Sequence, residues 1–365
     1  MKWREFHEKY ARLFWALHSA WALISGIAVL VLAHNRYGFL RWVVLFIALT
    51  WGSTLFFSRI AIDESSRALR FAQSVVSYLM RVMYQETLFF LIPFYFYSAT
   101  FPSWNFLYVI ALAALAVLSC FDLLFDRLLR EHRWFSTSFF AFVSFSALQF
   151  FLPLLLRTRI DNSEYLAAAI SFLAALALAR RLGDLRERRR LIAIAIAFAA
   201  VLIGVRVFRP LLPPVPLRMT RLRISGALNP RTLEAPRDFE QEIPASELRR
   251  GRIYAVATVF SPQRIPVRLQ MRFIENGKVL RQSRNLDLTA RPGGFRIWDS
   301  VKPVGNNASI RIEVWSAGQL LGKRTVRVVD GARTSRPQSL GVSPGDYFVI
   351  GRDARSLRAG MPALR

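Results

Sequence analysis

The sequence contains very little cysteine and histidine. Cys120 is the single cysteine among 365 residues, which excludes an intramolecular disulfide, and its apolar surroundings suit a small packing residue. Four histidines and one cysteine argue against a Cys/His zinc site. No histidine follows His132, so Ser-His-Asp and Cys-His groups are excluded from the C-terminal part. The chain also lacks a P-loop, a GxGxxG run after a strand and an HExxH motif. We therefore expect no metal or cofactor and favour a non-enzymatic role.

Acidic residues are also scarce. The chain has 24 Asp and Glu against 50 Lys and Arg, a net charge of +26. Up to Arg206, 22 basic residues accompany 12 acidic ones, and from Arg209 onward 28 accompany 12. Basic loops of a membrane protein explain the first excess. The second indicates either an anionic partner or an arginine-rich composition that serves solubility.

Long polar stretches are missing from residues 1–208. The chain is 53% hydrophobic, and a membrane-spanning helix needs about 20 mostly apolar residues. We predict a multi-pass α-helical membrane bundle of about seven transmembrane helices in this region. The first apolar run has no cleavage site of small residues, so we expect no cleaved signal peptide. The predicted spans are Leu13–Ala33, Leu40–Phe57, Val75–Tyr97, Trp104–Phe125, Phe135–Leu156, Tyr165–Ala179 and Leu191–Phe208.

Basic residues are distributed unequally between alternate loops. Sixteen Lys and Arg lie on the side of the N-terminus, and four lie on the other side. The positive-inside rule therefore places the N-terminus in the cytoplasm of a bacterial inner membrane. With seven spans, the chain after Phe208 lies outside, in the periplasm, whereas one missed or re-entrant span would place it inside.

The pattern changes from helix-like to strand-like after residue 208. Residues 209–218 are rich in proline, and we predict an extended linker. Short β-rich runs separated by turns such as Asn276-Gly277 predict an all-β, sandwich-like domain over residues 219–330. The basic residues 331–365 are expected to form a mostly flexible tail, whose apolar island at 346–350 adds an edge strand or docks on the domain. A loop is predicted at 229–250, and strands are predicted at 219–228, 252–260, 266–274, 278–288, 294–300, 308–316 and 319–329.

Polar residues interrupt the predicted spans, where a charge costs about 2.5–3.5 kcal/mol at a helix centre. They are Arg81, Gln85, Glu86, Asp122, Asp126 and Gln149. Arg81 and Glu86 point about 140° apart on a helix, so they cannot form one pair on the same face. Arg81 is expected either to extend towards the cytoplasmic interface or to pair with Asp122, and Gln149 is the best candidate to donate to Glu86. The residues either line a polar path or substrate pocket, or make interhelical hydrogen bonds that hold the bundle together.

Two tryptophans and one arginine are candidates for a binding surface on the β-domain. In residues 310–315, IRIEVW, the isoleucines and the valine are expected to face the core, and Arg311 and Trp315 the other side. Trp298 and Trp315 either form a platform for stacking on sugars or pack inside the domain. The expected partners are the lipid bilayer, an anionic lipid, lipopolysaccharide or glycan, and a partner protein. Nucleic acid is a candidate only if the domain is cytoplasmic.

Residues 342–360, VSPGDYFVIGRDARSLRAG, resemble the C-terminal box of type I signal peptidases in a degenerate form, at Gly351–Ser356. That family uses a serine nucleophile just after a membrane anchor and a lysine base on a following strand. The resemblance implies a hydrolase only if Ser225 and a lysine such as Lys278 lie side by side.

Most of the chain is similar to a family of uncharacterised bacterial inner-membrane proteins with a multi-pass helical part and a C-terminal β-domain, both classed as domains of unknown function. The segments that carry the resemblance are YQETLFFLIPFYFYSATFPSWN (84–105), LSCFDLLFDR (118–127), FIENGKVL (273–280), GFRIWDS (294–300) and IRIEVWSAGQLLG (310–322). The family's β-domain usually has Trp or His–Trp before the Asn-Gly turn, where this chain has Met271–Phe273. The resemblance implies an envelope location and no known activity.

These observations predict an inner-membrane protein with a non-enzymatic binding or scaffold role. Its exterior β-domain is expected to bind an anionic envelope component or a partner protein. The alternative is a transporter or channel-like component that uses Glu86 and its polar neighbours. A membrane-bound hydrolase is a third interpretation.

Overall fold

A computed structural model describes most of the chain after residue 66. The described residues are 24, 27, 28, 52, 67–179, 188–229, 232, 234–248, 251–290, 294–303, 308–329 and 347–348. Apart from four single residues, the predicted spans Leu13–Ala33 and Leu40–Phe57 lie outside this part. The chain divides into two compact units. The helical unit contains Met1–Phe96, Leu107–Leu155 and Asp161–Arg209, and the β unit contains Tyr97–Phe106, Leu156–Ile160 and Pro210–Arg365.

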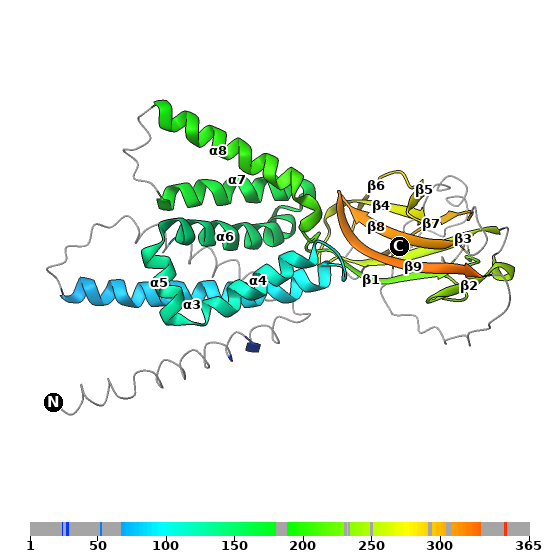
Figure 1. Cartoon of the computed structure of the whole chain (residues 1–365), viewed down its shortest axis with the longest axis horizontal. Helices are drawn as coiled ribbons and strands as arrows, with labels where there is room; N and C mark the ends of the chain where they lie inside the picture. The colour runs from blue at the N-terminus through cyan, green and yellow to red at the C-terminus, as the bar shows by residue number, and fades with distance from the viewer. Residues whose placement is uncertain are drawn as a thin grey trace, which may run out of the picture. The chain divides into compact units, whose positions relative to one another are not determined.

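The described part of the helical unit is built from α-helices (Figure 1). Three helices are long and apolar enough to cross a membrane, namely α6, α7 and α8. No residue of α8 is buried within the described part of the chain, whereas α6 is buried along much of its length. The helices are α3 (Arg67–Ser98), α4 (Phe106–Ser119), α5 (Asp122–Glu131), α6 (Arg133–Leu156), α7 (Ile160–Ala179) and α8 (Arg188–Val207).

The predicted fourth span, Trp104–Phe125, is not one continuous helix. Helix α4 has 14 residues. At 1.5 Å per residue it is about 21 Å long, which is short for a membrane span. The chain breaks at Cys120 and Phe121 and continues as the ten-residue α5, half of whose side chains are ionisable. The predicted seven-span bundle is therefore not confirmed. Residues 67–207 contain six described α-helices, of which three have the length and composition of a membrane span.

Aromatic side chains pack α3 against α6. Phe94 lies 4.6 Å from Phe150 between ring centroids, and the rings of Phe90 and Phe151 stack at 6.2 Å. Nearer the middle of α3, the ring of Tyr84 meets Phe139 edge-on at 5.5 Å. Pairs of this kind contribute beyond the apolar area that they bury, so the two helices form a well-specified interface.

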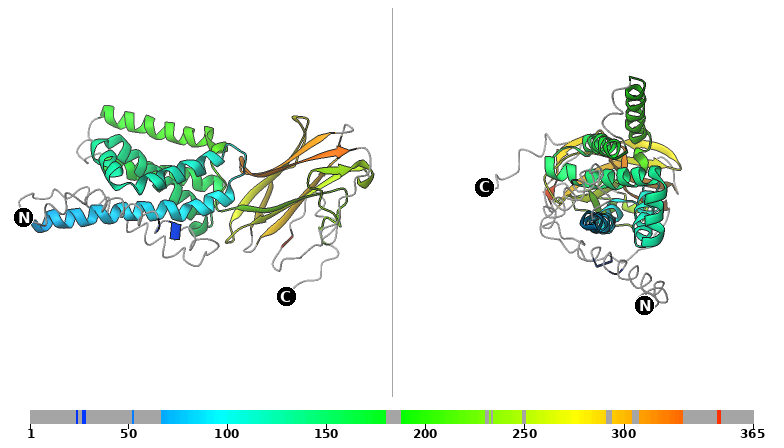
Figure 2. Two further views of the ribbon diagram at one scale, coloured as in Figure 1. Left: turned by 60° about the horizontal axis from the view of Figure 1, so that its bottom comes forward. Right: turned by 90° about the vertical axis from the view of Figure 1, so that its left-hand side faces the viewer.

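The β unit contains a sandwich of two sheets around one apolar core (Figure 2). The four-stranded sheet has the order β1-β3-β7-β10. The six-stranded sheet has the order β2-β9-β8-β4-β5, and β6 also pairs with β4. The strands are β1 (Arg218–Ser225), β2 (Glu242–Pro244), β3 (Ile253–Phe260), β4 (Pro266–Glu275), β5 (Lys278–Gln282), β6 (Leu286–Thr289), β7 (Phe295–Val301), β8 (Ser309–Ser316), β9 (Gln319–Val329) and β10 (Tyr347–Phe348).

Most predicted strands are confirmed, and two predictions need correction. The strand predicted over 278–288 is two strands, because β5 pairs with one half of β4 and β6 with the other half. The loop predicted over 229–250 contains β2, which pairs with β9 in parallel. The apolar island does supply an edge strand, since Tyr347 and Phe348 pair with β7. The rest of the tail lies outside the described residues.

The proline-rich segment is not an exposed, extended spacer. Residues 212–217 are all buried, and Leu217 belongs to the core of the sandwich. Leu212 and Val215 are 6% and 0% exposed. The apolar residues between the prolines therefore make this segment part of the packed β unit.

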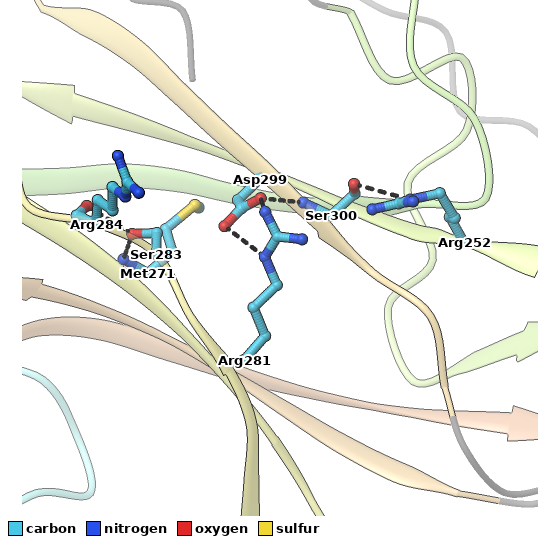
Figure 3. Close-up of polar contacts among 7 residues, drawn as sticks. All are labelled: Arg252, Met271, Arg281, Ser283, Arg284, Asp299 and Ser300. Atoms are coloured by element: carbon cyan, nitrogen blue, oxygen red, sulfur yellow. Dashed lines mark hydrogen bonds and ion pairs between the residues drawn. The ribbon is translucent and has the colours of Figure 1, made fainter. Parts of the chain in front are cut away.

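Arginine side chains join the two sheets at the edges of the sandwich. In Figure 3, Arg281 of β5 forms a two-pronged ion pair with Asp299 of β7, with nitrogen–oxygen distances of 2.8 and 3.3 Å. The same carboxylate accepts the Ser300 N–H at 2.8 Å. At another edge, Arg324 of β9 donates to the Leu222 carbonyl of β1 and to Asp238, the latter at 2.9 Å. Charge-assisted bonds of this geometry fix how the sheets face each other.

Two short segments that join helices belong to the β unit. Asn105 donates from Nδ2 to the Leu320 carbonyl at 2.8 Å, and Ile160 lies in the apolar core of the sandwich. The Arg218 guanidinium, at the start of β1, lies 4.4 Å from the centroid of the Tyr97 ring. Phe101 and Trp104 of the first segment are 76% and 72% exposed. The start of β1 and the start of β9 therefore mark the end of the sandwich that contacts the helix-joining segments.

Candidate functional site

A polar cluster lies inside the helical unit between α3, α4 and α6. The Tyr95 hydroxyl is 2.8 Å from the Ser146 carbonyl and 3.0 Å from Gln149 Oε1. The Tyr108 hydroxyl is 2.7 Å from Ser146 Oγ, and the two tyrosine rings stack at 5.1 Å. Tyr95 and Gln149 are both fully buried. The cluster therefore links three helices by hydrogen bonds, of which the one between Tyr95 and Gln149 is fully buried.

The predicted intramembrane residues are only partly placed around this cluster. Gln85 is buried on α3, and Glu86 is half-buried. Gln149 accepts a hydrogen bond from the Tyr95 hydroxyl. Tyr95 lies nine residues after Glu86, which is about 14 Å further along α3.

Three further predicted residues fall where only the helix is described. Arg81 lies on α3, and its side chain is outside the described part. Asp122 and Asp126 lie on α5 rather than at the end of a continuous fourth span, and their side chains are also outside the described part.

A buried ion pair was missed by the sequence analysis. Arg209 Nε lies 2.9 Å from Glu164 Oε2, and these side chains are 12% and 0% exposed. Arg209 also lies 6.0 Å from the centroid of the Tyr165 ring. Glu164 stands one residue before the predicted sixth span, and Arg209 opens the proline-rich segment, so each resembled a loop charge. The pair joins the beginning of α7 to the chain just after α8.

The three residues predicted for the β surface do not lie together. Trp298 is on β7 of the four-stranded sheet, and Arg311 and Trp315 are on β8 of the six-stranded sheet. The neighbours of all three along their strands are core residues, such as Ile297, Ile312 and Val314, so the three side chains point to the outer faces. The two tryptophans therefore do not share one stacking platform.

The outer face of the six-stranded sheet has its charges paired around Trp315. Its indole Nε1 donates to Glu313 at 2.9 Å, and the Arg272 guanidinium lies 4.6 Å from the centroid of its ring. Arg311 pairs with Glu313 at 2.9 Å. Glu313 thus bonds both the Trp315 indole and the Arg311 guanidinium on this face.

The outer face of the four-stranded sheet gathers arginines instead. In one row across β1, β3 and β7, Thr258 lies between Arg221 and Arg296. In the next row, Val256 lies between Arg223 and Trp298. We call Arg221, Arg223 and Arg296 the arginine array. Their sequence neighbours on these strands belong to the core, so the three side chains point away from it. Arg221 is exposed, Arg223 is half-buried and Arg296 is only 9% exposed.

Arg223 lies close to the like charges of Arg221 and Arg296. Burial lowers the pKa of the Arg223 guanidinium below its usual value, and the charges of Arg221 and Arg296 lower it further. Asp238 and Glu234 act in the opposite direction. Asp238 also accepts from Arg324 at 2.9 Å and from the Ile224 N–H at 3.0 Å, so it is shared. Arg223 therefore lies among charges of both signs.

The predicted peptidase pairing is not present. Ser225 lies on β1 of the four-stranded sheet, and Lys278 lies on β5, an edge strand of the six-stranded sheet. The Ser225 hydroxyl accepts the Ala227 N–H at 3.3 Å. The two side chains therefore do not form a nucleophile and its base, and the hydrolase interpretation is wrong for this pair.

Comparisons with known proteins identify a family. A search of curated proteins finds no match. Among solved structures, the chain is similar to the Pseudomonas fluorescens alkylpurine DNA glycosylase AlkC bound to DNA containing an abasic site analog, with 13% identity over 74% of this chain and 83% of that chain. The TM-score of 0.20 is too low to indicate a shared fold. A family model matches residues 2–255, which include all the described helices and the first part of the β unit. The chain therefore belongs to DUF5924, a family of unknown function.

Proposed function

We propose that this chain is an integral membrane protein that binds an anionic component of the cell envelope through its β-sandwich, without catalysis. The observation that carries the proposal is the arginine array. Arg221 is exposed and Arg223 is half-buried on the same face of β1, and like charges this close together favour the binding of an anion.

The helical unit supports the membrane part of the proposal. Helices α6, α7 and α8 have the length and apolar composition of membrane spans. Large apolar side chains on α8 are exposed, among them Ile196 at 65% and Ile203 at 62%. Lipid is the natural solvent for such a surface, because exposing it to water costs free energy in proportion to its area.

The loop charges support an exterior location for the β-sandwich. The segments 97–106 and 156–160, which belong to the β unit, contain two arginines, whereas residues 180–190 at the opposite ends of α7 and α8 contain six. The positive-inside rule then assigns residues 180–190 to the cytoplasm and the sandwich to the other side.

The polar cluster in the helices supports a structural role rather than transport. Tyr95, Tyr108 and Ser146 bond to one another or to helix backbone, and Gln149 accepts from Tyr95. Interhelical bonds of this kind stabilise membrane bundles. We therefore assign these residues to the stability of the bundle.

Binding to defined anions tests the proposed function. The purified full-length protein is offered phosphatidylglycerol vesicles, lipopolysaccharide and an acidic glycan, each at 50 mM and 500 mM NaCl. We expect saturable binding to at least one of them that weakens strongly at high salt, because the contacts are between exposed charges. Absence of binding to all three at low salt would contradict the proposal.

A further inference from the structure

We infer that the β-sandwich binds a buried water molecule between Ser316 and Gln319, at the hairpin that joins β8 to β9. The inference goes beyond the proposed function and does not depend on it. It is carried by three features of the β unit: the strand register that places the two side chains, the polar atoms that they bury, and the neutral chemistry of these groups.

Strand register places the two side chains together on the inner face of the six-stranded sheet. Leu269 of β4 lies opposite Ser316 of β8, and Ser316 lies opposite Gln319 of β9. Leu269 belongs to the apolar core, and residues in one row of a sheet point to the same face. The Cβ atoms of directly opposite residues in an antiparallel pair are about 4.5–5.5 Å apart. Ser316 and Gln319 therefore share one small region on the core side of the sheet.

Both side chains bury polar atoms for which the described part of the protein supplies no hydrogen-bond partner. These atoms are Ser316 Oγ and both the oxygen and the nitrogen of the Gln319 amide. Ser316 is 1% exposed and Gln319 is 0% exposed. A buried donor or acceptor that is left unpaired costs the full free energy of removing it from water, so most such groups in proteins are bonded to protein or to ordered water.

A third polar group belongs to the same end of the β unit. Thr100 Oγ1 is likewise buried and has no hydrogen-bond partner among the residues that the structure describes. Asn105 holds this segment beside the hairpin, because it accepts the Thr100 N–H at 3.1 Å and donates to the Leu320 carbonyl at 2.8 Å. Leu320 directly follows Gln319, which makes the Thr100 hydroxyl a candidate third contact. A buried water typically makes about three hydrogen bonds to groups of this kind.

The chemistry of these groups favours water over an ion or a larger ligand. One amide and two hydroxyls offer both donors and acceptors, and a water molecule can satisfy both kinds. A buried ion of either sign would need an opposite charge to offset the loss of its hydration, and these three side chains are neutral. A sugar or a peptide would need an open pocket, whereas Ser316 and Gln319 are almost completely buried.

The test removes polar atoms at nearly constant side-chain size and measures thermal unfolding of the full-length protein in detergent. We expect Gln319→Met and Ser316→Ala each to lower Tm by about 2–4 °C, because the water loses a partner. An amide that is buried without a partner would behave in the opposite way, since an apolar side chain in its place is neutral or stabilising. An unchanged or higher Tm for Gln319→Met would therefore overturn the inference. The matched control is Gln282→Met at an exposed position of β5, which should shift Tm by less than about 1 °C.

A double variant tests whether the two side chains share one water. Ser316→Ala/Gln319→Met should lower Tm by less than the sum of the two single changes, because both act on the same bound molecule. Additive changes would contradict a shared water. Should a variant fail to fold, a crystal structure of the unchanged protein at a resolution that shows ordered water decides the question. We expect density within hydrogen-bonding distance of both Ser316 Oγ and the Gln319 amide, and direct bonds from protein atoms in its place would overturn the inference.

Discussion

Individual ion pairs in the β-sandwich differ mainly in burial. Asp299 is 12% exposed and holds Arg281 across the two sheets, whereas Asp287 is 60% exposed and pairs with Arg268 on the surface. We expect Asp299→Ala to lower the free energy of unfolding by about 1–3 kcal/mol, because the partly buried Arg281 guanidinium and the Ser300 N–H would lose their acceptor. Asp287→Ala is the matched control and should cost about 0–1 kcal/mol. Denaturant unfolding of the purified protein, followed by tryptophan fluorescence, measures both. Equal losses would show that the cross-sheet pair has no special role.

The exposed pair should show its contribution in the pH dependence of stability. The hydrogen bond from Arg268 lowers the pKa of Asp287 below its usual range. A carboxyl group with a lowered folded-state pKa stabilises the fold above its unfolded pKa of about 3.9, and this stabilisation is lost as the pH falls through the folded value. The difference in stability between the unchanged protein and Arg268→Gln should therefore be present at pH 6 and shrink below about pH 4.

The hydrogen bond between Tyr95 and Gln149 makes a prediction for the helices. Tyr95→Phe and Gln149→Leu each remove one side of a fully buried bond. In a double-mutant cycle, the double variant should lose about 0.5–1.5 kcal/mol less than the sum of the single losses, the range measured for bonds between membrane helices. Thermal unfolding in detergent gives the three values. Additive losses would mean that the two residues act separately.

Residues that come together from distant segments were harder to predict from the sequence than the fold around them. Arg221, Arg223 and Arg296 come from two strands separated by 70 residues, and only the register through β3 brings them into neighbouring rows. Glu164 and Arg209 were missed for a similar reason, since a charge next to a span usually faces water. A single sequence shows periodicity along a strand or helix, whereas these groups depend on pairing between distant segments.

At the scale of elements, one glycine lies where two backbone segments leave no room for a side chain. A Cβ added at Gly226, just after β1, would lie 2.0 Å from the Glu247 carbonyl oxygen, which cannot move without the backbone. We expect Gly226→Ala to destabilise the β-sandwich by about 1–3 kcal/mol. The control is Gly322→Ala, whose Cβ would meet only the end of the Met219 side chain, at 1.8 Å from Cε. A methionine can adopt another rotamer, so the control should cost less. Denaturant midpoints compare the two, and a larger loss for Gly322→Ala would contradict this explanation.

Strands were predicted well because their signals are local. Alternation in residues 310–315 gave the faces of β8, and the turns at Asn276-Gly277 and Ala317-Gly318 adopt the positive φ angles that end one strand and begin the next. The division between β5 and β6 had no such signal. Ser283 accepts the Met271 N–H at 2.9 Å, so a side chain rather than a glycine turn holds the kink. Similarly, the apolar pattern of the predicted fourth span ran through Cys120, where the helix breaks.

The whole molecule combines two kinds of surface. Helices α6, α7 and α8 have the composition of membrane spans, and the β-sandwich carries an array of positive charge on one sheet. The unequal distribution of basic residues between loops underlies our proposal for the orientation of the chain, in which the basic loops lie in the cytoplasm and the sandwich lies outside. The proposed anionic partner depends on this assignment, since only an exterior sandwich would meet components of the cell envelope.

Labelling of single introduced cysteines tests this arrangement most directly. The native Cys120 is 2% exposed and is replaced by alanine as background. Lys278→Cys places a thiol on the exposed start of β5, and Arg189→Cys places one in the exposed first turn of α8. In intact spheroplasts, a membrane-impermeant maleimide should label Lys278→Cys, and it should label Arg189→Cys only after lysis. Labelling of both positions before lysis, or of Arg189→Cys alone, would contradict a membrane-spanning α8 with an exterior β-sandwich.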